Sequence, residues 1–71
     1  MNIYAIYYID EGDRYYFMQR KDAMQCGIDY IHRLCADEHW DPQETESLVN
    51  EFLRNEWVAD ICALDVIDVK E

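Results

Sequence analysis

The periodicity of the hydrophobic residues changes once along this chain, near residue 20. Residues 2–18 are rich in isoleucine and tyrosine, which favour strands, and Glu11-Gly12-Asp13 interrupts them as a typical hairpin turn. From residue 20 onward the hydrophobic residues recur every three or four positions, as on a helix that covers a sheet. This change predicts an antiparallel β-hairpin followed by a helix.

A second helix is predicted to begin at Asp41, because Asp41 suits the N-cap, Pro42 suits the first helical position, and Glu44 can complete a capping box. We expect this helix to end at or before Asp60. Its hydrophobic face is predicted to contain Leu48, Val49, Phe52 and Leu53, with Trp57 one turn further along.

Residues 61–69 alternate as a strand does and complete the predicted order ββααβ. A chain of 71 residues is long enough for one hydrophobic core, so residues 1–71 are predicted to form a single α+β domain. Its architecture is a three-stranded sheet with two helices packed on one face. Gly27 lies on the hydrophobic face of the first helix, which indicates a close approach to a strand or to the second helix.

The face of the sheet that the helices leave uncovered is expected to be hydrophobic, whichever way the first strand is oriented. One orientation exposes Tyr4, Ile6 and Tyr8, and the other exposes the residues between and beside them: Ile3, Ala5, Tyr7 and Ile9. The sequence leaves both orientations open. An exposed surface of this kind often marks a partner site or a dimer interface.

The net charge of −10 arises from sixteen acidic and six basic residues and is unevenly distributed. Residues 37–71 contain eleven of the acids and only two of the bases. This charge would repel nucleic acid and anionic membranes and attract basic proteins, although it also serves solubility. We therefore expect a protein partner with a basic surface, no direct contact with nucleic acid and no membrane association.

Carboxylates one helical turn apart, at about 5–6 Å between Cβ atoms, can present negative charge at a repeat similar to that of a nucleic-acid backbone. Aromatic side chains commonly anchor such an interface, while the surrounding charges set the rate of association. The candidate partner-binding residues are Asp37, Glu38, Asp41, Glu44, Glu46 and Glu51, with Tyr4 and Tyr8 as anchors.

The sequence gives no support for a metal, a cofactor or catalysis. Cys26, Cys35 and Cys62 are odd in number and widely spaced, which is typical of reduced, buried cysteines in the cytoplasm. His32, Cys35 and His39 have helical spacing but lack the second close pair that structural zinc sites use. Acidic neighbours disfavour a reactive thiolate. We expect no catalytic residue, no metal site and no cofactor, with His32 and His39 exposed and Cys35 packed beneath the helix.

In its length of 71 residues and its net charge of −10, the chain resembles the small acidic proteins of bacteriophages and mobile elements. Among these are anti-CRISPR and anti-restriction inhibitors, several of which are compact α+β domains. The resemblance implies an inhibitor that blocks a basic surface of a defence or nucleic-acid-processing protein in the cytoplasm of a bacterial host. The alternative is a homodimeric structural or adaptor module that associates through the uncovered face of the sheet, and an enzyme ranks third.

Overall fold

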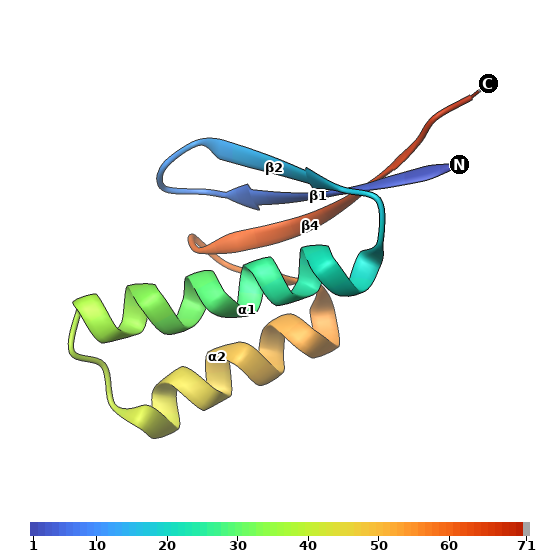
Figure 1. The fold of residues 1–71 in the computed structure, drawn as a ribbon. Coiled ribbons are helices and arrows are strands. Elements are labelled where there is room, and N and C mark those ends of the chain that lie inside the picture. Colours follow the sequence, from blue (N-terminus) through green and yellow to red (C-terminus); the bar gives the residue numbers. More distant parts are fainter. Residues whose placement is uncertain (71) are drawn as a thin grey trace.

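Residues 1–70, which the computed structural model describes, form two helices and a four-stranded antiparallel sheet. The elements are β1 (Asn2–Tyr8), β2 (Asp13–Phe17), α1 (Arg20–Asp37), α2 (Pro42–Asn55), β3 (Trp57–Val58) and β4 (Cys62–Asp68) (Figure 1). The strands lie in the order β2-β1-β4-β3. The predicted α+β class is confirmed. The predicted three strands in the order ββααβ are wrong in detail, because β3 adds a fourth strand between α2 and β4.

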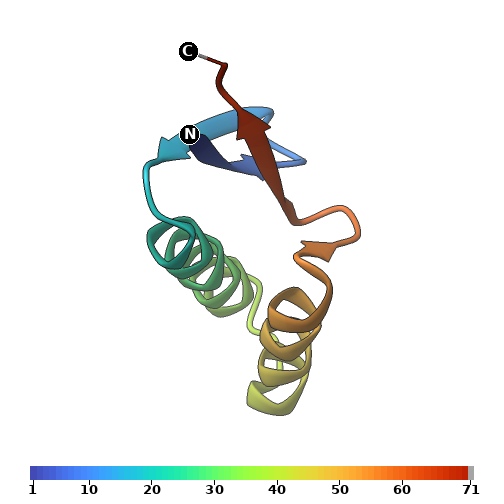
Figure 2. The same ribbon diagram turned by 90° about the vertical axis from the view of Figure 1, so that its right-hand side faces the viewer.

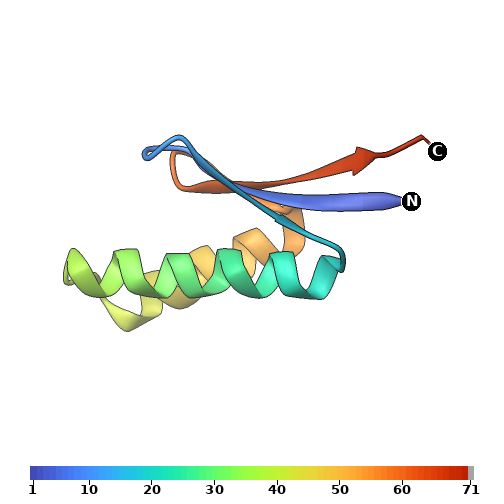
Figure 3. The ribbon, with the colours of Figure 1, turned by 45° about the horizontal axis from the view of Figure 1, so that its top comes forward.

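Both helices lie on the same face of the sheet, as Figures 2 and 3 show from two directions. α1 contacts β1, β2 and β4, whereas α2 packs against α1 and β3. The beginning of β1 and the end of β4 extend past the helices (Figure 1), and the molecule measures 45 × 22 × 17 Å. None of the elements described above covers the opposite face of the sheet.

The β1–β2 hairpin forms where the sequence predicts it. Gly12 has a φ of 73°, which glycine adopts without strain, and its N–H donates to the Tyr8 carbonyl oxygen at 2.8 Å. Tyr8 then pairs with Asp13 across the hairpin. The hairpin turn is therefore confirmed, together with the strands on either side of it.

The orientation of β1 is decided by its packing on α1. Ile6 and Tyr8 are buried in the core with Met24, Tyr30 and Ile31 of α1, and Tyr4 packs against the edge of the same cluster. The side chains of Ile3, Ala5 and Tyr7 consequently lie on the uncovered face. Tyr8, one of the two predicted anchors, thus points into the protein.

Gly27 allows α1 and α2 to approach closely, as its place on the helix indicates. A Cβ atom at this position would lie 2.5 Å from Cζ and 2.6 Å from Cε2 of Phe52. The Phe52 side chain is fully buried and belongs to the core cluster. The absence of a side chain at position 27 therefore makes room for the phenylalanine ring of the second helix.

α2 begins as predicted but ends earlier than its hydrophobic pattern suggests. The Asp41 carboxylate accepts a hydrogen bond from the Gln43 N–H at 2.8 Å, which caps the helix. Glu56 adopts a φ of 60°, and its N–H donates to the Phe52 carbonyl oxygen at 2.7 Å. This left-handed residue reverses the chain, so Trp57 enters β3 and does not extend the hydrophobic face of α2.

Candidate functional site

The six carboxylates predicted to bind a partner all lie on the two helices and their connection. Residues 34–53 contain these six acids and no lysine or arginine. The acids in and around β3 and β4 are placed elsewhere: Glu56 forms an ion pair with Arg20 at 3.1 Å, and Asp65 pairs with Ala5 in the sheet. The helices and their connection therefore carry the longest stretch of unbalanced negative charge within residues 1–70, and residues 55–69 form a shorter one with four acids.

The six carboxylates do not form one continuous track along α2. A helix turns by about 100° per residue, so Glu46 lies roughly 140–160° around the helix axis from Glu44 and Glu51. Glu44 and Glu51 share one flank of α2, and Glu46 occupies the other flank. The carboxylates of α2 are thus divided between two flanks, and the densest group of the six acids lies at the connection between the helices.

We call this group the acidic tip, and it consists of Asp37, Glu38, Trp40, Asp41 and Glu44. His39 ends α1 with a φ of 56°, and the Trp40 N–H donates to the Cys35 carbonyl oxygen at 2.9 Å, as in a Schellman motif. The Trp40 indole N–H donates to the Glu38 carboxylate at 2.7 Å. Its side chain nevertheless remains 41% exposed. The acidic tip therefore holds a partly exposed tryptophan in a fixed orientation among four carboxylates.

Trp40 also lines a small surface pocket of about 290 Å³. The other lining residues are His32, Ala36, Pro42 and Thr45. Sequence analysis did not identify Trp40, because it follows the first helix and belongs to no hydrophobic stripe. The sequence feature that could have identified Trp40 is its position in an acidic segment, where Glu38 precedes it by two residues and Asp41 follows it directly.

The two predicted tyrosine anchors lie on the side of the sheet that faces the helices. Tyr8 is 5% exposed, stacks on Tyr30 with the ring centroids 3.7 Å apart, and shares a 3.1 Å hydrogen bond between its hydroxyl and the Cys26 sulfur. Burial and this hydrogen bond raise the pKa of Tyr8. Tyr4 is half-buried on the same side of the sheet. The expectation that Tyr8 is an exposed anchor is wrong, because β1 turns this side chain toward α1.

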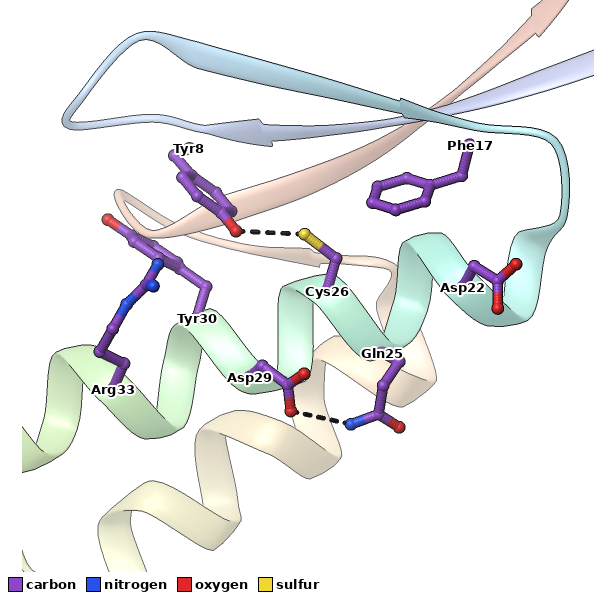
Figure 4. A pocket seen from close by; sticks show the side chains of 8 residues that line it. All are labelled: Tyr8, Phe17, Asp22, Gln25, Cys26, Asp29, Tyr30 and Arg33. Carbon is purple, nitrogen blue, oxygen red and sulfur yellow. Dashed lines mark hydrogen bonds between the residues drawn. The ribbon is translucent and has the colours of Figure 1, made fainter.

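A groove lies between β2 and α1, and Figure 4 shows the side chains that line it. Its volume is about 440 Å³. The lining residues are Tyr8 of β1, Phe17 of β2 and six residues of α1: Asp22, Gln25, Cys26, Asp29, Tyr30 and Arg33.

Two interactions order the polar rim of this β2–α1 groove. The Gln25 amide donates to the Asp29 carboxylate at 2.9 Å, and the Arg33 guanidinium lies 5.6 Å from the centre of the Tyr30 ring. Sequence analysis missed the groove because β2 and α1, although consecutive in the chain, leave a groove between them only through the way α1 packs on the sheet. The spacing of Asp22, Gln25 and Asp29 along one side of a helix was the only local signal.

The uncovered side of the sheet forms a third surface, the outer sheet face. Tyr16, Trp57 and Ile67 are 60%, 53% and 36% exposed there. Tyr7 lies between them, with the Arg14 guanidinium 5.0 Å from its ring centre. The uncovered face therefore carries exposed hydrophobic residues, among them the aromatic Tyr16 and Trp57, but the exposed charged residues Arg14 and Asp65 lie on it as well.

The cysteines and histidines are arranged as packing and surface groups. Cys35 and Cys62 are buried, Cys26 is half-buried, and all three are free thiols. Burial raises the pKa of the Cys62 thiol to about 12, so this thiol stays protonated at neutral pH. His32 and His39 are exposed above Cys35, as predicted. No group of three or more His, Cys, Asp or Glu side chains within residues 1–70 is positioned to hold a metal ion.

Neither of the two helices in residues 1–70 is long and hydrophobic enough to cross a membrane. Comparisons with protein-family models, curated proteins and solved structures found no match to this chain. The function is therefore inferred from its surfaces.

Proposed function

We propose that this protein binds a basic surface of another protein through its acidic tip. The observation that carries this proposal is the exposed Trp40 side chain among four carboxylates, in a segment without lysine or arginine. Tryptophan is enriched among the residues that dominate binding energy, and surrounding charges mainly accelerate association and exclude partners of like charge. The acidic tip places an exposed tryptophan and surrounding carboxylates together where α1 ends and α2 begins.

The partner that fits this surface is a protein whose own basic groove or patch handles a polyanion. Occupying such a patch would block it, which is the mode of action that the resemblance to anti-CRISPR and anti-restriction inhibitors implies. The division of the carboxylates around α2 favours a compact docking site over imitation of a long nucleic-acid backbone. We therefore propose an inhibitor that competes at one basic site and carries out no chemistry itself.

The test compares two triple variants with the same change in net charge. The tip variant is Asp37→Asn, Glu38→Gln and Glu44→Gln, which leaves the helix cap at Asp41 intact. The control variant is Asp60→Asn, Asp65→Asn and Asp68→Asn, which neutralises exposed acids that follow β3 or lie in β4. Each protein, and a Trp40→Ala variant, would be used to capture partners from bacterial lysate, and affinities for the captured protein would then be measured at low and high salt.

We expect the control variant to bind as the wild type does, and Trp40→Ala to bind at least about tenfold more weakly. Binding by the wild type should weaken between about 50 and 500 mM salt, because the screening length falls several-fold over this range. Equal binding by the tip variant and the control variant, or affinity that salt does not change, would contradict the proposal.

A homodimer formed through the outer sheet face is the second candidate, and the exposure of Tyr16 and Trp57 on one face favours it. Burial of such a patch against a second copy would remove hydrophobic surface from water. Analytical ultracentrifugation across micromolar concentrations tests this candidate. A dimer should dissociate in Tyr16→Ser and Trp57→Ser variants, and a monomer at every concentration would rule it out.

A further inference from the structure

We propose that the β2–α1 groove binds an extended peptide segment of a partner, which pairs with β2 as an additional strand and places basic side chains in the groove. This surface is separate from the acidic tip. The inference combines three observations: the free edge of β2, the position of the groove beside it, and the chemistry of the groove lining.

The outer edge of β2 carries backbone groups that pair with no other strand of residues 1–70, since β2 ends the strand order. Two hydrogen bonds fix which groups these are: Val69 N–H to the Met1 oxygen at 2.9 Å, and Ile9 N–H to the Ile61 oxygen at 3.0 Å. In an antiparallel ladder, odd-numbered residues of β1 therefore bond toward β4 and even-numbered ones toward β2.

The β2 residues paired with those even-numbered positions are Asp13, Tyr15 and Phe17. Their N–H and C=O groups are therefore used within the sheet. The N–H and C=O groups of Arg14 and Tyr16 consequently point outward from the edge. An extended peptide can use such groups to join a sheet as a further strand.

The groove lies beside this edge and has the length of a short strand. Its lining runs along α1 from Asp22 to Arg33, a rise of about 16 Å at 1.5 Å per residue. The five residues of β2 span a similar distance of about 16 Å at 3.3 Å per residue. A segment paired with β2 would therefore have α1 alongside it, and every second side chain would face the groove.

The groove lining suits a side chain with a long apolar stem and a positive end. Phe17 supplies partly exposed aromatic surface, Tyr8 and Tyr30 add little because they are 5% and 3% exposed, and Asp22 and Asp29 supply carboxylates at the rim (Figure 4). Burial, followed by the carboxylates of Glu11 and Asp10, raises the pKa of Tyr30, so negative charge also surrounds the hairpin end of the groove.

Arg33 is the one cationic side chain in the lining, and it lies over the Tyr30 ring. Neither Asp22 nor Asp29 forms an ion pair within residues 1–70, and Asp29 accepts a hydrogen bond only from the neutral Gln25 amide, so both can still pair with a lysine or arginine of the partner. Lysine and arginine pack their methylene stems on apolar surface while the charge stays at the rim. Tyr8 and Arg33 already contact the Tyr30 ring, so a partner charge would gain a cation–π contribution only over the partly exposed Phe17 ring.

The probe is a fluorescein-labelled, end-capped eight-residue peptide that alternates lysine and threonine, so all lysines can face the groove together. Binding to the full chain would be followed by fluorescence anisotropy. The control peptides are a glutamate–threonine analogue and the lysine–threonine peptide methylated on every backbone nitrogen. The latter retains the side chains but cannot donate backbone hydrogen bonds.

The matched protein variants are Tyr16→Pro and Tyr16→Thr. Proline removes an N–H that points outward, which an edge strand tolerates, whereas threonine removes the aromatic ring and keeps the N–H. The charge variants are Asp22→Asn with Asp29→Asn, compared with Glu38→Gln with Glu44→Gln at the acidic tip. This second pair distinguishes failure of the groove inference from failure of the function proposed for the tip.

We expect micromolar binding of the lysine–threonine peptide and roughly tenfold weaker binding in the Asp22→Asn, Asp29→Asn variant. Tyr16→Pro and backbone methylation should each weaken binding at least about tenfold. Tyr16→Thr and the Glu38→Gln, Glu44→Gln double variant should stay within about twofold of wild type.

Four results would overturn the inference. The first is no binding of the lysine–threonine peptide up to about 1 mM, a weak limit for a peptide complex. The second and third are binding of the glutamate–threonine peptide, or of the methylated peptide, as tight as that of the lysine–threonine peptide. The fourth is loss of binding in the Glu38→Gln, Glu44→Gln double variant but not in the Asp22→Asn, Asp29→Asn variant. The methylated peptide tests the backbone bonds on the wild-type protein, so the outcome does not depend on the folding of Tyr16→Pro.

Discussion

Replacing Gly27 with alanine should destabilise the protein, although alanine favours helix formation more strongly than glycine. Gly27 is buried within α1, and an added Cβ would lie 2.5 Å from Cζ and 2.6 Å from Cε2 of Phe52. Ordinary carbon–carbon contacts are about 3.5–4.0 Å. The Phe52 side chain is 0% exposed and surrounded by the core, so its ring has no solvent into which it could move.

Two opposing effects determine the size of this destabilisation. Helix propensity favours alanine over glycine by roughly 0.8–1.0 kcal/mol. Insertion of a methyl group into a packed core typically costs about 1–3 kcal/mol. The difference predicts a net loss of about 1 kcal/mol in the free energy of unfolding. For a domain of this size, such a loss lowers the Tm by about 4–8 °C.

Urea denaturation followed by far-UV circular dichroism would measure this loss, with Phe52→Leu and the double variant completing a double-mutant cycle. The smaller leucine side chain should relieve the contact, so Gly27→Ala should cost less in the Phe52→Leu background than in the wild type. A higher urea midpoint for Gly27→Ala in the otherwise wild-type protein would refute the explanation. Gly27 would then be a weak point in the helix and not a requirement of helix packing.

Two further predictions concern the helix cap and alkaline pH. Asp41→Ala should lower the free energy of unfolding by about 1 kcal/mol, because the Gln43 N–H loses its acceptor, whereas Asp41→Asn should change it by only a few tenths. Equal urea midpoints for the two variants would contradict this role. Burial raises the pKa of Cys62 from 9.0 to about 12, so the unfolded chain releases this proton first. Stability should therefore be complete below pH 9 and fall as pH rises toward 12, and the raised pKa of Tyr8 adds to the decline. Melting temperatures measured against pH should fall less steeply for Cys62→Val than for the wild type, and identical slopes would exclude a contribution from Cys62.

Features that depend on neighbouring residues could be predicted from the sequence. The hairpin follows from strand-forming residues on both sides of Gly12, and the start of α2 follows from Asp41 and Pro42. The role of Gly27 was also predictable, because glycine on the hydrophobic side of a helix indicates close packing. Only the tertiary structure identified Phe52 as the residue that occupies the space.

The orientation of β1 could not be predicted, because both of its sides are hydrophobic. Tyr7 and Tyr8 are chemically identical, and only packing against Tyr30 of α1 places Tyr8 inside. Because of this ambiguity, both predicted partner anchors, Tyr4 and Tyr8, belong to the side of β1 that faces the helices. The acids at the acidic tip were found from charge alone, but the orientation of Trp40 among them depends on the way α1 ends.

Sequence alone therefore determined the class of fold, the principal elements and the half of the chain that carries the charge. Tertiary structure decided the fourth strand, the exposed side of the sheet, the division of carboxylates around α2 and the existence of the β2–α1 groove. The physical reason is the range of the interactions involved. Turns, caps and amphipathic stripes arise between residues a few positions apart. Strand order and the shape of a groove depend on how whole elements pack together, and the energy of that packing depends on the entire core.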